Sequence, residues 1–257
     1  MTESSISRRR VLTGSGALLG AALLTSIPGT TLLATPAYAD SHGRTPTGED
    51  IRKAFRRYHE NQSRVRTGRT SPNGWEMEKV AGGGGTIWAR PVPGTPVRDV
   101  TVRIGDVETV LVHVIRRFHY EIDELRQDDI AGWRSPGKVR KGLPEGNLAS
   151  GTAIRIRAGH YPAGTRGGFF PEQQLVIRDI LAELDGVVRW GGDDRKPDEA
   201  LFYIDVKPGN GQLGKTADRL RIWQDTPGQG AGAPLDMTSA SRRRAAERLE
   251  KFQSTAK

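Results

Sequence analysis

The chain lacks cysteine altogether and has only five histidines among its 257 residues. No disulfide and no thiolate metal site can form, so any metal would need His, Asp or Glu ligands, and stability must come from a packed core. The chain also lacks an internal repeat and an apolar run of about 20 residues, the length that a membrane-spanning helix needs. These absences exclude a disulfide scaffold and a repeat architecture.

Positive charge is what the chain has in excess, with 39 Lys and Arg against 30 Asp and Glu and a formal net charge of +9. This balance fits nucleic acid, an anionic cell wall or membrane, or simple solubility. No nucleic-acid recognition motif accompanies the charge, so we expect no nucleic-acid partner. An anionic wall polymer or solubility is favoured, because the first segment directs the chain out of the cell.

Residues 1–39 have the three parts of a secretory signal peptide. Arg8, Arg9 and Arg10 form a twin-arginine pattern, a short apolar run covers residues 17–24, and an A-x-A end precedes Asp40. Paired arginines indicate the Tat export route. We therefore expect a secreted or wall-associated protein that meets the membrane only during export. An uncleaved membrane anchor is the alternative.

The apolar pattern predicts an α+β fold, with a small antiparallel sheet flanked by helices. Helical spacing predicts helices over residues 49–65 and 171–184, and a third helix that Asp106 opens as its N-cap. Strands are expected at residues 100–104, 151–156, 187–190 and 200–206. Length and composition give one sizeable domain with tails.

We divide the chain into the signal (1–39), a linker with an N-terminal helical and loop region (40–98), a main domain (99–225) and a basic flexible tail (226–257). The tail carries three consecutive arginines and is either a lone helix or disordered. Whether residues 49–98 pack on the main domain is left open. His113 and His119 lie six apart on one predicted helix, so they are expected to be packing or surface residues rather than metal ligands.

Four ordered segments carry a more specific pattern. They are Gly132-Trp133-Arg134-Ser135-Pro136, residues 147–156, residues 186–193 and residues 198–204. In order and spacing they resemble the M15 family of zinc peptidases, which includes D-alanyl-D-alanine carboxypeptidases and endolysins of the VanY type. The resemblance covers residues 100–223, about half of the chain, and implies a Hedgehog/D-Ala-D-Ala-peptidase-like fold.

In that family a His, an Asp seven residues later and a second His hold zinc, with the fourth position open for water. A carboxylate three residues before the second His is the general base, and an Arg in the first segment steadies the substrate carbonyl. The resemblance places Leu148, Arg155 and Leu201 at the ligand positions. It places Asp198 at the general-base position and Arg134 at the substrate position.

An aliphatic side chain has no lone pair to donate and a guanidinium repels a cation, so the resemblance implies a degenerate site without zinc or another cofactor. Asp198 and Arg134 would then be vestigial. His160 with scattered carboxylates is a weak replacement for the zinc site, and a hard cation on oxygen ligands is a further alternative. Arg134 either binds a peptide carboxylate or caps a loop.

Arg155 suggests a pairing. If the ligand positions converge as in the family, its guanidinium points toward Asp198, because a buried arginine needs a partner. The alternative is a surface residue on a drifted strand. The expected function is that of an exported, non-catalytic protein that binds cell-wall peptide, peptidoglycan or a wall-associated partner. The alternative is an active zinc D-alanyl-D-alanine carboxypeptidase acting on peptidoglycan stem peptides.

Overall fold

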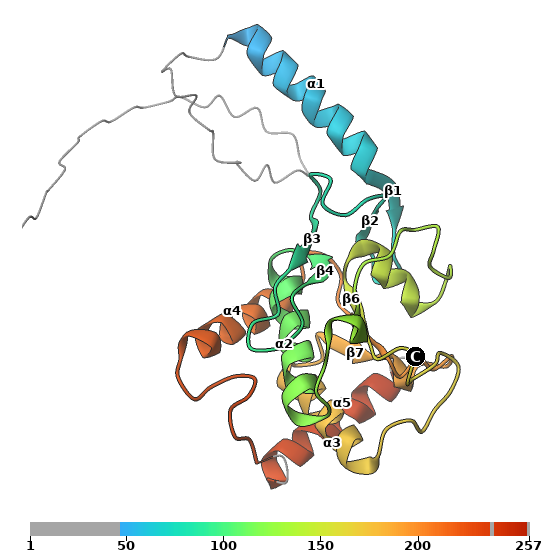
Figure 1. The fold of residues 1–257 in the computed structure, drawn as a ribbon, viewed down its shortest axis with the longest axis vertical. Coiled ribbons are helices and arrows are strands. Elements are labelled where there is room, and N and C mark those ends of the chain that lie inside the picture. The colour runs from blue at the N-terminus through green and yellow to red at the C-terminus, as the bar shows by residue number, and fades with distance from the viewer. Residues whose placement is uncertain (1–46, 237–238, 256–257) are drawn as a thin grey trace, which may run out of the picture. The chain divides into compact units, whose positions relative to one another are not determined.

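The computed structural model describes residues 47–236 and 239–255, so the expected signal lies outside the described residues. Helices and strands are mixed as the α+β prediction requires (Figure 1). The helices are α1 (Gly48–Val65), α2 (Asp106–Glu121), α3 (Pro171–Glu183), α4 (Gly211–Asp225) and α5 (Ala240–Thr255), with short 3-10 turns η1 (Gln127–Asp129), η2 (Pro144–Ser150) and η3 (Gly191–Asp193). The strands are β1 (Arg66–Thr70), β2 (Glu76–Glu78), β3 (Ile87–Arg90), β4 (Val100–Arg103), β5 (Ile130–Ala131), β6 (Ala153–Ile156), β7 (Val188–Trp190) and β8 (Leu201–Ile204).

A four-stranded antiparallel sheet in the order β5-β6-β8-β7 lies at the centre of the fold. All four residues of β8 are buried, because the strand pairs on both edges and both of its faces are covered. Phe202 of β8 makes an edge-to-face contact with Phe118 of α2, with the ring centroids 6.4 Å apart. Trp190 of β7 and Phe202 are 3 % and 0 % exposed, so both belong to the core.

The start of α2 differs in detail from the prediction. The helix begins at Asp106, but the N-cap is Gly105, whose φ of 89° favours glycine. Glu108 closes the turn by accepting a hydrogen bond from the Gly105 N–H at 3.3 Å. The Asp106 carboxylate instead accepts a hydrogen bond from Arg221 of α4 at 2.7 Å, so it ties two helices together.

Residues between α1 and β4 pack on the main domain, which settles the point that the sequence left open. Ser71 donates a hydrogen bond to Ser150 at 2.8 Å, and Asn73 donates one to the Ile204 carbonyl at 2.8 Å. Trp75 donates its indole N–H to the Val206 carbonyl, also at 2.8 Å. The β1-β2 hairpin is therefore fixed to the far end of β8.

A buried cluster of charges joins α2, α3 and α5, and we call it the Arg117 cluster. Its members are His113, Arg117, Glu121, Asp179, Glu183 and Arg242. Arg117 is fully buried and donates to Asp179 at 2.8 Å, to Glu183 at 2.9 Å and to Glu121 at 2.6 Å. His113 bonds to Glu183 at 2.8 Å, so it is a packing residue as expected. His119 accepts a hydrogen bond from the Leu125 N–H.

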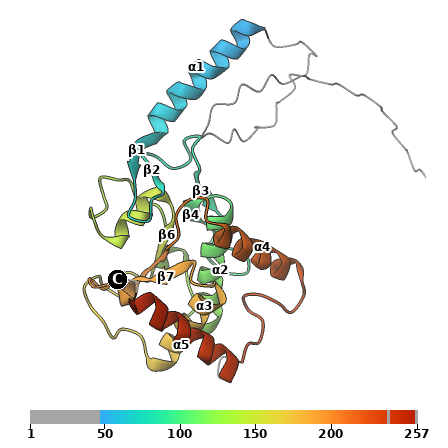
Figure 2. The ribbon, with the colours of Figure 1, turned by 180° about the vertical axis from the view of Figure 1, so that it is seen from behind.

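The expected flexible tail is wrong for residues 240–255, which form α5 and pack against α3 (Figure 2). Arg242, one of the three consecutive arginines, donates to Asp179 at 2.7 Å and to Glu183 at 2.8 Å. Near the other end of α5, Gln253 donates to the Val188 carbonyl and accepts a hydrogen bond from Arg189 through its own carbonyl. The helix is therefore held at both ends by buried polar contacts that the sequence pattern did not indicate.

Glu183 should give the protein a distinct acid sensitivity. Burial raises the pKa of Glu183, but the hydrogen bond from His113 and the charge of Arg117 outweigh burial and hold the pKa at about 2. The pKa of Glu183 in the folded state lies below its ordinary value of 4.5, so the ionised carboxylate stabilises the folded state fully at pH values above 4.5. This contribution is lost as the pH falls toward 2. Between pH 7 and pH 3 the loss should amount to about 2 kcal/mol.

Glu183→Gln should therefore flatten the pH dependence of the unfolding free energy, measured by urea titration at pH 7 and pH 3. Glu172→Gln, an exposed glutamate on the same helix, is the matched control and should retain the wild-type slope. An unchanged slope in Glu183→Gln would contradict the assignment.

Within α1, Val65 is the one buried residue, and the helical stripe that predicted this helix is exposed instead of packed. Among the described residues, none of the helices has both the length and the apolar character needed to cross a bilayer.

Candidate functional site

The three positions that the resemblance assigns to metal ligands converge in space. Antiparallel pairing of β6 with β8 sets Arg155 directly opposite Leu201. Leu148 lies in η2, which packs against both strands. Leu148 and Leu201 are 0 % and 1 % exposed and form a small apolar cluster with Ala153 and Tyr203. The side of the site that these four residues form is therefore apolar and shielded from solvent.

Arg155 pairs with Asp198, as the sequence analysis predicted. The Arg155 Nη2 donates to Asp198 Oδ1 at 3.1 Å, and the two side chains are 11 % and 6 % exposed. The alternative of a surface arginine on a drifted strand is therefore wrong. Two buried atoms of the pair, Arg155 Nε and Asp198 Oδ2, have no hydrogen-bond partner among the described residues.

The backbone around Asp198 holds its side chain in place. Its N–H donates to the Gly191 carbonyl at 2.9 Å, and its own carbonyl accepts from the Leu201 N–H at 2.9 Å. A Cβ on Gly191 would lie 2.6 Å from the Asp198 carbonyl oxygen, so only glycine permits this approach. A Cβ on Gly151 would likewise lie 2.8 Å from the Arg103 backbone nitrogen. Both positions therefore need glycine for close packing of the backbone.

The protonation of Asp198 reflects its burial. Burial raises the pKa of the carboxyl above its ordinary range, and the neighbouring Arg155 opposes the shift only in part. Glu145 adds to the increase, because a second negative charge disfavours ionisation of the first. A further hydrogen-bond donor at the buried Asp198 Oδ2 would stabilise the ionised carboxylate.

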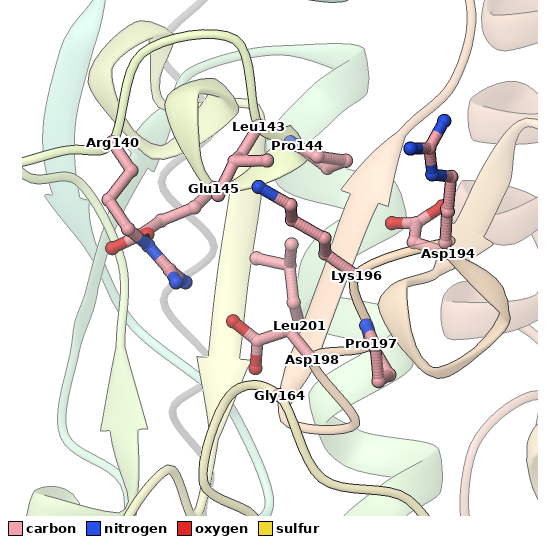
Figure 3. Close-up of a pocket in the computed structure, with 11 residues that line it drawn as sticks. Arg140, Leu143, Pro144, Glu145, Gly164, Asp194, Lys196, Pro197, Asp198 and Leu201 are labelled. Carbon is pink, nitrogen blue, oxygen red and sulfur yellow. Dashed lines mark hydrogen bonds and ion pairs between the residues drawn. The ribbon is translucent and has the colours of Figure 1, made fainter.

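Asp198 and Leu201 line a pocket of about 220 Å³. Figure 3 shows them between Arg140 and Glu145 on one side and Lys196 and Pro197 on the other. Arg140 forms an ion pair with Glu145, whose side chain is 8 % exposed. The other residues that line the pocket are Leu143, Pro144, Gly164, Asp194 and Arg195.

Charge is distributed unevenly in this pocket. Arg140 is paired with Glu145, and Asp198 is paired with Arg155. The buried carboxylate of Asp194 accepts a hydrogen bond from the Tyr203 hydroxyl at 3.1 Å. Arg195 and Lys196 are exposed at the mouth. The pocket therefore offers buried acceptors inside and two cations at its entrance.

The remaining predicted residues lie outside the pocket. Arg134 is half-buried, and its backbone N–H donates to the Leu148 carbonyl at 3.4 Å, so it lies beside the first ligand position without lining the pocket. His160 is exposed in the loop after β6 and does not line the pocket. Neither Arg134 nor His160 is therefore placed in the pocket as a metal ligand.

Zinc does not fit the residues at the converged positions. Leu148 and Leu201 supply no donor atom, and the Arg155 guanidinium places a positive charge where a cation would bind. Across residues 47–236 and 239–255, no group of three or more His, Asp or Glu side chains is arranged to hold a metal ion. The polar groups present at this site can form hydrogen bonds and ion pairs.

Sequence reasoning missed the half of the pocket that comes from residues 140–145. Arg140 and Glu145 lie on an irregular segment and in the first turn of η2, where no periodic pattern marks them. Their spacing of five residues matches no helix or strand repeat, so no local signal was present to find them.

Comparison with known proteins found no match among protein-family models, curated proteins or solved structures.

Proposed function

We propose that this chain is an exported, non-catalytic protein similar to the M15 peptidases, which binds cell-wall stem peptide or a wall-associated partner in the pocket beside Asp198. The proposal includes a Hedgehog/D-Ala-D-Ala-peptidase-like fold for the main domain. The observation that supports it is the Arg155–Asp198 ion pair, which joins a position that the resemblance assigns to a metal ligand with the one that it assigns to the general base.

The pair supports binding without cleavage. A metal-dependent peptidase activates water by placing it on the metal next to a carboxylate base. Here a guanidinium neutralises that carboxylate, and two leucines keep donor atoms away. Asp198 therefore has no activated water to deprotonate, while the pocket that it lines is retained.

The pocket itself supports a peptide ligand. Asp198 Oδ2 is a buried acceptor without a partner among the described residues, and a peptide N–H is a suitable donor for it. Arg195 and Lys196 at the mouth suit a carboxylate on the same ligand. A peptide that carries amide groups and a free carboxylate would satisfy both ends of the pocket.

Retention on purified peptidoglycan tests the proposal. The protein should co-sediment with it, and EDTA should not release it, because no metal takes part. Arg195→Glu combined with Lys196→Glu should weaken retention about tenfold, as expected when two charge contacts become repulsive. Cleavage of a D-alanyl-D-alanine peptide should be undetectable in the same preparation.

The matched control reverses two exposed charges far from the pocket, Lys215→Glu with Lys251→Glu, and changes the net charge by the same amount. This control should bind as the unmodified protein does. Equal loss in both double variants would assign retention to bulk charge and overturn the pocket. One zinc per chain with EDTA-sensitive cleavage would overturn the non-catalytic reading.

A further inference from the structure

Helix α1 carries an apolar stripe that no described residue covers. Ile51, Phe55 and Tyr58 follow one another at spacings of four and three residues, so they lie on one face of the helix. They are 49 %, 60 % and 57 % exposed. Three adjacent large apolar side chains exposed on one helix face indicate an interaction surface, whereas single exposed apolar residues do not.

Cations cover most of the helix surface outside this stripe. At about 100° of rotation per residue, Arg52 borders the stripe, Arg56 and Arg57 lie further round on either side, and Lys53 lies on the face opposite Ile51. No acidic residue interrupts residues 51–59. Of the acids in α1, Glu60 lies on the face opposite Ile51, while Glu49 and Asp50 belong to the first turn, where Asp50 forms a capping box with Thr47.

This arrangement discriminates between possible occupants. A second copy of α1 would cover the stripe, but it would supply no anionic groups for the basic side chains, and two basic helices repel each other. A wall polymer supplies phosphate or carboxylate groups but little apolar surface for Phe55 and Tyr58. An anionic lipid surface supplies both parts, because acyl chains take the stripe and headgroup phosphates take the cations.

We infer that α1 lies on anionic lipid bilayers, with Ile51, Phe55 and Tyr58 inserted at the level of the headgroups. Aromatic side chains favour this depth, and the long arginine and lysine side chains beside them reach back to the phosphates. The expected signal ends at Ala39, so an exported chain still attached at that point would hold Thr47 within about 25 Å of the bilayer. This contact adds a lasting membrane association to the transient one expected during export.

Vesicle flotation tests the inference with the chain that starts at Asp40, which contains the whole of the compact unit 47–257. The protein should bind vesicles of phosphatidylglycerol and phosphatidylcholine, and should bind vesicles of phosphatidylcholine alone at least tenfold more weakly. Phe55→Ala with Tyr58→Ala should weaken binding to the anionic vesicles at least tenfold. Soluble glycerol phosphate at equal phosphate concentration should not compete.

The control Phe252→Ala removes an aromatic side chain that is 68 % exposed on another helix, and it should bind vesicles normally. Circular dichroism verifies that α1 stays helical in the double variant. Equal binding to both vesicle types, or equal loss with Phe252→Ala, would overturn the inference. So would concentration-dependent dimers that disappear with the double variant in the absence of vesicle binding. Because peptidoglycan retention depends on the pocket, it should be unaffected by these α1 substitutions.

Discussion

Arg117→Met should lower the free energy of unfolding by about 3–5 kcal/mol. Arg117 is 0 % exposed and binds three carboxylates, those of Glu121, Asp179 and Glu183. Without it, Asp179 and Glu183 would keep Arg242 as an arginine partner while Glu121 would lose the partner it has in the cluster, and burying uncompensated negative charge is costly. Equilibrium unfolding in urea, followed by circular dichroism, measures the change.

A surface ion pair serves as the control for this experiment. Arg221 also binds two carboxylates, those of Asp106 and Asp218, but its side chain is 41 % exposed. Arg221→Met should therefore cost less than about 1 kcal/mol. If Arg117→Met does not fold, Arg117→Lys retains the charge and should unfold at intermediate urea concentrations. A loss in Arg117→Met as small as that in Arg221→Met would contradict the role given to the cluster.

Introducing the three ligand types that the resemblance implies should create a zinc site. The variant Leu148→His, Arg155→Asp, Leu201→His is expected to bind about one zinc per chain, whereas the unmodified chain binds none. The reason is geometric, because β6 and β8 set positions 155 and 201 opposite each other and η2 brings position 148 to the same cluster. Two imidazoles and a carboxylate are a common zinc ligand set. Elemental analysis after gel filtration measures the metal content.

The matched control keeps the cation. Leu148→His with Leu201→His introduces both imidazoles but leaves Arg155 in place, and its guanidinium should block the metal by repulsion. A folded triple variant that holds no zinc would show that the three positions do not form the site that the resemblance implies. Near-ultraviolet circular dichroism establishes folding independently of metal content.

The secondary structure was predictable where apolar periodicity was strong. Residues 171–184 carry a continuous helical stripe, and the structure has α3 at Pro171–Glu183. Helix α4 was missed because only a few of its residues are buried, and Gly211, Gly214 and Lys215 interrupt the pattern. Its position is set by packing against α2, which a local pattern does not encode.

The candidate site was also predictable only in part. The Arg155–Asp198 pair was predictable because an ordered motif brings both positions to known places in the resembling family, and a buried arginine needs a counter-charge. The Arg140–Glu145 side of the pocket was not predictable, since it comes from an irregular segment and from η2, which packs against β6 and β8. Likewise, the Arg117 cluster collects side chains from three helices: its members recur every four residues within α2 and within α3, but no local pattern shows that these faces meet each other and Arg242.

The anchoring of α5 changes where the folding unit ends. Arg242 supplies a cation to two carboxylates of α3, and Gln253 exchanges hydrogen bonds with β7. Neutralisation of the buried charge therefore depends on residues well beyond 225, where the main domain was expected to end. A fragment cut at that boundary would retain the motif but lose a counter-ion that its interior requires. Cooperative unfolding should therefore involve the C-terminal helix and the central sheet together. The unit that folds is larger than the segment that carries the resemblance.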